Sequence, residues 1–68
     1  MKFTVETEQE DVGRWIAEVI DLPGVLVYAQ TCEEAIAQVQ ALALRVVAER
    51  LERGETKSDL VSISFQAA

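Results

Sequence analysis

The sequence predicts an α+β domain with elements in the order β-β-β-α-β: an antiparallel three-strand meander, one helix packed on the sheet, and a fourth strand. Three observations predict it. Apolar and polar residues alternate near both ends of the chain, a Pro-Gly turn lies at 21–24, and a helix-start signal lies at Thr31. With 68 residues, the chain is long enough for one core, so residues 1–68 are expected to form a single domain.

The first two strands are predicted from period-two alternation. Phe3, Val5 and Thr7 alternate with polar residues, and the polar stretch 9–13 ends in Gly, as hairpin connections often do. Residues 14–20 form the second strand, in which Trp15, Ala17 and Val19 share one face and Ile16, Glu18 and Ile20 share the other. Since this second face is partly apolar, we expect it to be covered as well.

The third strand follows the turn Asp21-Leu22-Pro23-Gly24, where Pro fixes φ and Gly tolerates a positive φ. Residues 25–29 are almost wholly apolar, which is typical of a strand covered on both faces. Short connections between the three strands favour an antiparallel meander. A last strand is expected at 60–65, with Val61, Ile63 and Phe65 on one face.

The helix is predicted to run from Thr31 to about Arg53. Thr31 and Glu34 form a capping box, and Gly54 suits the position after the helix end. Its apolar residues cover a wide arc, about twice the stripe that one sheet face needs. A loosely patterned, alanine-rich helix would explain the arc; we favour a homodimer or higher oligomer, with the partner contact at Leu42, Leu44 and Val46. The predicted packing centre comprises Phe3, Val5, Trp15, Val27, Ile36, Val39, Ala43, Val47 and Ile63.

The residue inventory argues against catalysis, metal binding and a bound cofactor. The chain has one cysteine and no histidine, so it lacks a disulfide and the usual general base. Cys32 fits a small buried hydrophobe better than a reactive thiol at the helix start. Glu6, Glu8 and Glu18 could share a sheet face as in a metal nuclease, but the strand at 60–65 offers no acid. A solvated face is the better interpretation.

The charge pattern favours a protein partner. The net charge is −6, and residues 1–34 carry eight acidic and two basic residues, so the whole excess lies in the first half. Such a surface repels nucleic acid and attracts a basic protein, although acidity can also serve solubility alone. No export signal or membrane span is apparent, so a cytoplasmic location is expected. The candidate partner-binding residues are Glu6, Glu8, Glu10, Asp11, Glu18 and Asp21.

Three motifs in order, at 13–19 (GRWIAEV), 21–24 (DLPG) and 31–35 (TCEEA), resemble the HicB-type antitoxin family, over roughly residues 3–65. The resemblance implies a partial ribonuclease-H-like fold without nuclease activity, cytoplasmic oligomers, and binding to a small basic ribonuclease toxin of double-stranded-RNA-binding fold. The chain departs from the family at Ala29-Gln30, where Gly-Asp is frequent. It also lacks the DNA-binding segment that many members append, so a stand-alone form is expected.

Two functions stay open at this point. One is an antitoxin-like domain that occludes the RNA-binding surface of a toxin. The other is a stand-alone oligomeric HicB-like domain that binds another ligand or serves a structural role, without a toxin partner.

Overall fold

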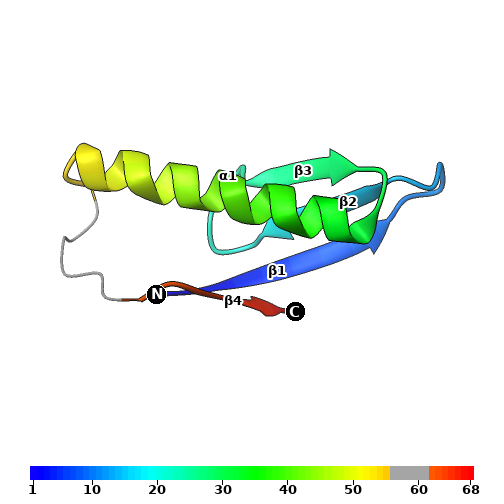
Figure 1. The fold of residues 1–68 in the computed structure, drawn as a ribbon, viewed down its shortest axis with the longest axis horizontal. Helices are drawn as coiled ribbons and strands as arrows, with labels where there is room; N and C mark the ends of the chain where they lie inside the picture. The colour runs from blue at the N-terminus through cyan, green and yellow to red at the C-terminus, as the bar shows by residue number, and fades with distance from the viewer. Residues whose placement is uncertain (56–61) are drawn as a thin grey trace.

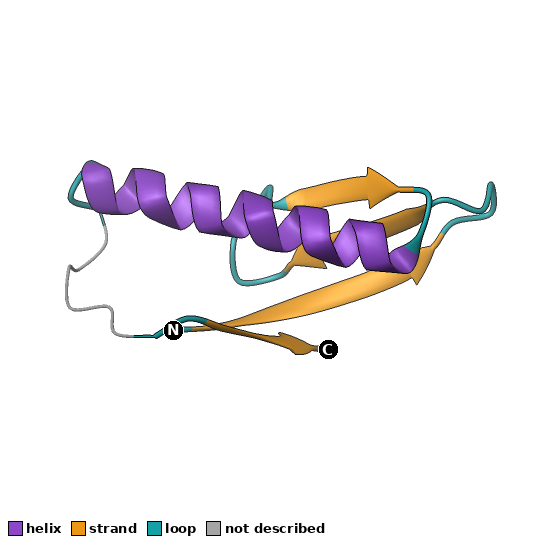
Figure 2. Cartoon of the chain, in the orientation of Figure 1, coloured by secondary structure: helices purple, strands orange, loops and turns teal. Residues whose placement is uncertain are grey.

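The structure, a computed structural model, describes residues 1–55 and 62–68 as a four-stranded mixed sheet with one helix lying across one face (Figures 1 and 2). The strand order is β3-β2-β1-β4, in which β1, β2 and β3 form an antiparallel meander and β4 pairs in parallel with β1 at the edge. The predicted α+β class and element order are confirmed. The elements are β1 (Lys2–Gln9), β2 (Trp15–Val19), β3 (Leu26–Ala29), α1 (Cys32–Glu52) and β4 (Ser64–Ala67).

A tight hairpin joins β1 to β2. The backbone N–H of Glu10 donates to the carbonyl of Arg14 at 2.8 Å, and the N–H of Gly13 donates to the carbonyl of Glu10 at 2.8 Å. Gly13 has φ +89°, a conformation that three-residue hairpin loops require at their last residue and that glycine adopts without strain. The hairpin sets the register in which Val5 faces Val19 across the two strands.

The Asp-Leu-Pro-Gly segment forms a type II turn that is built into the core. The N–H of Val25 donates to the carbonyl of Leu22 at 3.1 Å, and Gly24 takes the positive φ of +85° that this turn needs after proline. Leu22 and Val25 are only 4% exposed. Oδ2 of Asp21 accepts a 2.6 Å hydrogen bond from the backbone N–H of Thr4 on β1, so the turn also ties β2 to its neighbour.

Both ends of α1 are capped as the sequence indicates. Oγ1 of Thr31 accepts a 3.1 Å hydrogen bond from the backbone N–H of Glu34. At the other end Gly54 has φ +73°; its N–H donates to the carbonyl of Leu51, and the N–H of Glu55 donates to the carbonyl of Arg50. These two bonds are the Schellman arrangement, which satisfies carbonyls that the helix itself leaves unpaired.

The core lies between α1 and the facing side of the sheet. Two valines, Val19 and Val39, are the largest fully buried side chains, whereas the larger Phe3 and Leu22 each keep 4% of their surface exposed. At the β1–β4 edge, the rings of Phe3 and Phe65 pack with centroids 5.6 Å apart. The buried set is Phe3, Val5, Ala17, Val19, Leu22, Val25, Ala35, Val39, Ala43 and Val47, with Trp15, Val27, Ala29, Leu42, Val46, Ile63 and Phe65 partly buried against it.

Three details of the fold predicted from the sequence are wrong. The strand β3 is not covered on both faces, because Leu26 and Tyr28 are 37% and 47% exposed. The same holds for the second face predicted for residues 14–20, because Ile20, directly after β2, is 47% exposed and no described element forms a layer over this face. The last strand begins at Ser64 rather than at 60 and extends to Ala67; the part of that prediction at 60–61 lies outside the described residues.

Candidate protein-binding face

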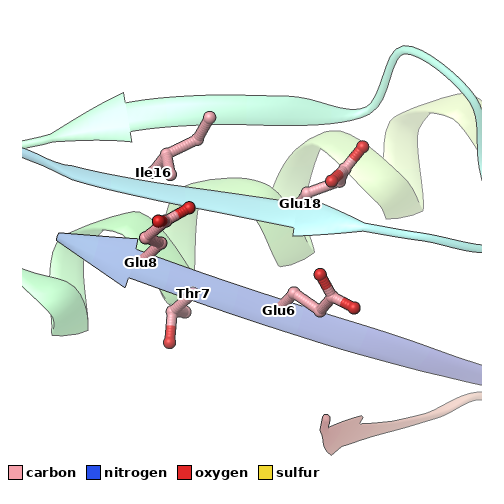
Figure 3. A pocket seen from close by; sticks show the side chains of 5 residues that line it. All are labelled: Glu6, Thr7, Glu8, Ile16 and Glu18. Atoms are coloured by element: carbon pink, nitrogen blue, oxygen red, sulfur yellow. The ribbon is translucent and has the colours of Figure 1, made fainter. Parts of the chain in front are cut away.

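The face of the sheet turned away from α1 carries a group of acidic and apolar side chains. Successive residues of a strand point to opposite faces. Because Ala17 and Val19 are buried under the helix, Ile16 and Glu18 point to the other side. Figure 3 shows Glu6, Glu8, Ile16 and Glu18 standing on this side of the sheet. We call this surface the open face and define it by Glu6, Glu8, Ile16, Glu18, Ile20, Leu26 and Tyr28.

Three carboxylates of the open face are direct neighbours. Glu6 on β1 lies opposite Glu18 on β2, and Glu8 lies opposite Ile16, one diagonal step from Glu18. Side chains directly opposite one another across two strands have Cβ atoms about 5 Å apart, so like charges in this arrangement repel and destabilise the sheet. Together with Thr7 and Ile16, the three glutamates line a shallow hollow of about 230 Å³.

No basic side chain in the described part of the chain forms an ion pair with these three glutamates. The two ion pairs found there are Arg14 with Glu10, at 2.6 Å between Nε and Oε1, and Arg53 with Glu55, at 3.9 Å. Arg14 also stacks over the ring of Tyr28, with Cζ 4.2 Å from the centroid. The hydrogen bond and the negative charge of Glu10 raise the pKa of the Arg14 guanidinium, so the charge of Arg14 is already paired with Glu10.

Apolar side chains adjoin the carboxylates. Ile16 on β2 lies opposite Tyr28 on β3, and Glu18 lies opposite Leu26. Ile20, Leu26 and Tyr28 are among the most exposed large hydrophobic residues of the described chain. Charged groups beside exposed apolar and aromatic groups are what a protein-binding surface combines, whereas a surface that serves solubility needs only the charge.

The six predicted partner-binding residues therefore divide into two groups. Glu6, Glu8 and Glu18 lie together on the open face. Glu10 is bound to Arg14, Asp11 lies in the loop of the β1–β2 hairpin, and Asp21 holds the Thr4 amide. The sequence reasoning missed the apolar members of the face. The signal was available in Ile16 and Ile20, which alternate with buried residues but were expected to be covered.

The three residues predicted to form the oligomer contact lie on two different sides of α1. Leu42 and Val46 pack partly against the core beneath α1, because they lie on the flank of the helix nearest the sheet. Leu44 points away from it and is 45% exposed. Sequence periodicity alone could not separate these positions, since it gives the width of the apolar arc but not the side on which the sheet lies.

Other kinds of site find less support in residues 1–55 and 62–68. They contain no group of three His, Cys, Asp or Glu side chains placed to hold a metal ion. Cys32 is half-buried in the first turn of α1. No described helix has the length and apolar character needed to cross a membrane. These observations leave the open face as the strongest candidate site.

Searches of the chain against protein-family models, curated proteins and solved structures each returned no match. The HicB-type resemblance thus rests on its three motifs, and each of them has a structural role in this fold. The first motif contains β2, the second is the type II turn, and the third caps α1. The motif residue Glu18 differs from these, because its side chain points to the open face and forms no ion pair within residues 1–55 and 62–68.

Proposed function

We propose that this domain is a non-catalytic, antitoxin-like interaction module that neutralises a small basic ribonuclease by covering the surface on which that enzyme holds RNA. The observation that carries the proposal is the trio Glu6, Glu8 and Glu18, which forms no ion pair among the described residues and lies beside exposed apolar side chains on one sheet face. Lysines or arginines of a partner would occupy the positions between the carboxylates. The carboxylates would then stand where RNA phosphates otherwise lie.

The electrostatics support a basic protein over a nucleic acid. With a net charge of −6, the chain repels a phosphate backbone and attracts cations over a distance of about 8 Å at physiological salt. The repulsion between Glu6 and Glu18 is relieved when a partner cation lies between them, so part of the binding free energy is stored in the free domain. The HicB-type resemblance is the reason for proposing that this basic partner is a ribonuclease, because that family binds toxins of this kind.

A non-catalytic role fits the chemistry of the same face. The chain has no histidine, and the positions of β4 that continue the open face hold Ser64 and Gln66 in place of acids. Two-metal hydrolysis needs ligands that converge from several elements. The three glutamates come from only two neighbouring strands, β1 and β2.

The experiment compares two triple variants as baits in cells that natively express the protein. In the first, Glu6, Glu8 and Glu18 are changed to Gln; in the second, the exposed Glu49, Glu52 and Glu55 are changed to Gln, with the same loss of charge. The wild type and the second variant should capture a small basic protein that the first variant loses. The captured protein should cleave RNA when released, and added domain should suppress the cleavage.

Two outcomes would contradict the proposal. If no basic protein is captured by the wild-type domain, there is no antitoxin-like partner. If both triple variants lose the partner equally, overall charge rather than the open face determines binding.

A further inference from the structure

The side of α1 opposite the sheet carries an apolar stripe that the fold does not use. Ala37, Ala41, Leu44, Ala48 and Leu51 are all exposed, with Leu44 at 45% and Leu51 at 36%. At about 100° per residue these five positions span about 80° of the helix surface, roughly opposite the buried Ala35, Val39, Ala43 and Val47. We call this surface the outer face of α1.

The spacing of the outer face is that of a helix–helix seam. Its residues are separated alternately by four and three positions, an average of 3.5, which keeps a stripe aligned with a second helix over its whole length. α1 has 21 residues, or about 31 Å, so it is much longer than the four- and five-residue strands that it covers. The seam runs through the middle and the C-terminal half of this helix.

We propose that the outer face of α1 binds the same face of a second copy of this chain, in an antiparallel two-fold pair. The shape of the stripe suits this occupant. Leu44 lies at its middle, with Ala37 and Leu51 seven residues away on either side. An antiparallel copy therefore brings the large Leu51 of each protomer to the small alanines, Ala37 and Ala41, at the other end of its partner's stripe. Alanines at such positions let two helices approach closely.

Charge selects the orientation. The first turn of α1 carries Glu33 and Glu34, whereas the last turn and cap mix Arg50 and Arg53 with Glu49 and Glu52. Antiparallel helices place the acidic first turn of one copy at this mixed end of the other and set the two helix dipoles in opposite directions, whereas parallel helices would place the four glutamates of the two first turns together. The open face is a poor alternative for self-association, because two copies would set Glu6, Glu8 and Glu18 of each against those of the other.

Size gives a further reason for the pair. A 68-residue domain buries little apolar surface, and this one has no fully buried side chain larger than valine in its described part. Pairing through α1 would cover Leu44 and Leu51, the two exposed leucines of this helix. The two open faces would then point outwards on opposite sides, so a pair would hold two basic partners; this last consequence, unlike the pairing itself, rests on the proposed function.

Sedimentation equilibrium on the whole chain at micromolar concentration tests the pairing. The wild type should sediment at twice its 7.5 kDa mass. Leu44→Glu and Leu51→Glu should each weaken the dimer about 100-fold, since each buries two unpaired carboxylates at the seam. Ile20→Glu, which changes an equally exposed residue of the open face, is the matched control and should leave the dimer intact. Circular dichroism checks that each variant is folded.

Cross-linking tests the orientation without relying on disruptive variants. In a Cys32→Ser background, a short bismaleimide should link Leu44→Cys to itself, and Ala37→Cys to Leu51→Cys in a mixture of the two. A monomeric wild type would overturn the pairing, and so would a dimer that survives Leu44→Glu but not Ile20→Glu. Efficient linking of Ala37→Cys to itself would overturn the antiparallel arrangement.

Discussion

The two faces of the sheet are made from the same strands but differ in burial and charge. On the side of α1, residues such as Ala17 and Val19 are fully buried. On the open face, their neighbours Ile16 and Glu18 are only half-buried, and Glu18 faces another glutamate. No described residue buries a polar side chain on the covered face, so this face contributes to folding without the cost of an unpaired polar group. The open face keeps a repulsive pair that a fold alone would not need, and this difference is the reason that we propose it as the surface for a partner.

The largest effect is expected from placing the same charge on adjacent residues of β2. Ala17→Lys should prevent folding, because it buries an unpaired ammonium where the wild-type side chain has no exposed surface. Ile16→Lys should change the free energy of unfolding by less than about 1 kcal/mol, because the new cation lies beside Glu8 and Glu18 on the open face. Urea unfolding followed by circular dichroism measures both. Equal losses would mean that the open face is covered.

A second contrast separates acidic residues that hold the fold from those that do not. Asp21→Ala should lower the free energy of unfolding by about 1–2 kcal/mol, since it removes a charged acceptor from the Thr4 amide. Asp11→Ala, in the hairpin loop, should have almost no effect. The same urea titration decides this. If the two variants are equally stable, the 2.6 Å bond contributes nothing and Asp21 is free to serve a partner.

A smaller loss is expected at the start of α1. Thr31→Ala should cost about 1 kcal/mol, because the Glu34 amide loses the hydroxyl that accepts its hydrogen bond. Thr31→Ser keeps the hydroxyl and should be nearly as stable as the wild type. An unchanged unfolding midpoint in the alanine variant would mean that another group caps the start of α1.

Local signals in the sequence predicted the local structure well. The capping box at Thr31, the Pro23-Gly24 turn and the alternation around Val5 each depend on a few neighbouring residues, and the structure confirms all three elements. Leu22 and Val25 were missed as core residues. Turn residues are usually exposed, and only tertiary packing decides that these two side chains point inward.

The candidate site was harder to predict, because it depends on which side of the sheet the helix takes. Sequence alternation assigned Ile16 and Glu18 to one face of β2 but could not tell whether anything covers that face. It also could not give the register that sets Glu6 opposite Glu18. The same limit applies to Leu42 and Val46, because the sequence pattern that suggested a partner contact could not show that both also pack partly on the core.

The smallest predicted effect is also the one that bears most directly on the difference between the faces. Glu18→Gln should stabilise the free domain by about 0.5 kcal/mol, because Glu18 lies opposite Glu6 and diagonal to Glu8. Glu52→Gln, on the exposed side of the last helical turn, is the control and should be neutral. The gain should fade in about 1 M salt, where charges are screened beyond about 3 Å. If Glu18→Gln instead destabilises the domain at every salt concentration, the carboxylate is part of the fold. A gain in stability together with weaker binding of a basic partner would show that the open face keeps its charge for that partner at the expense of the sheet.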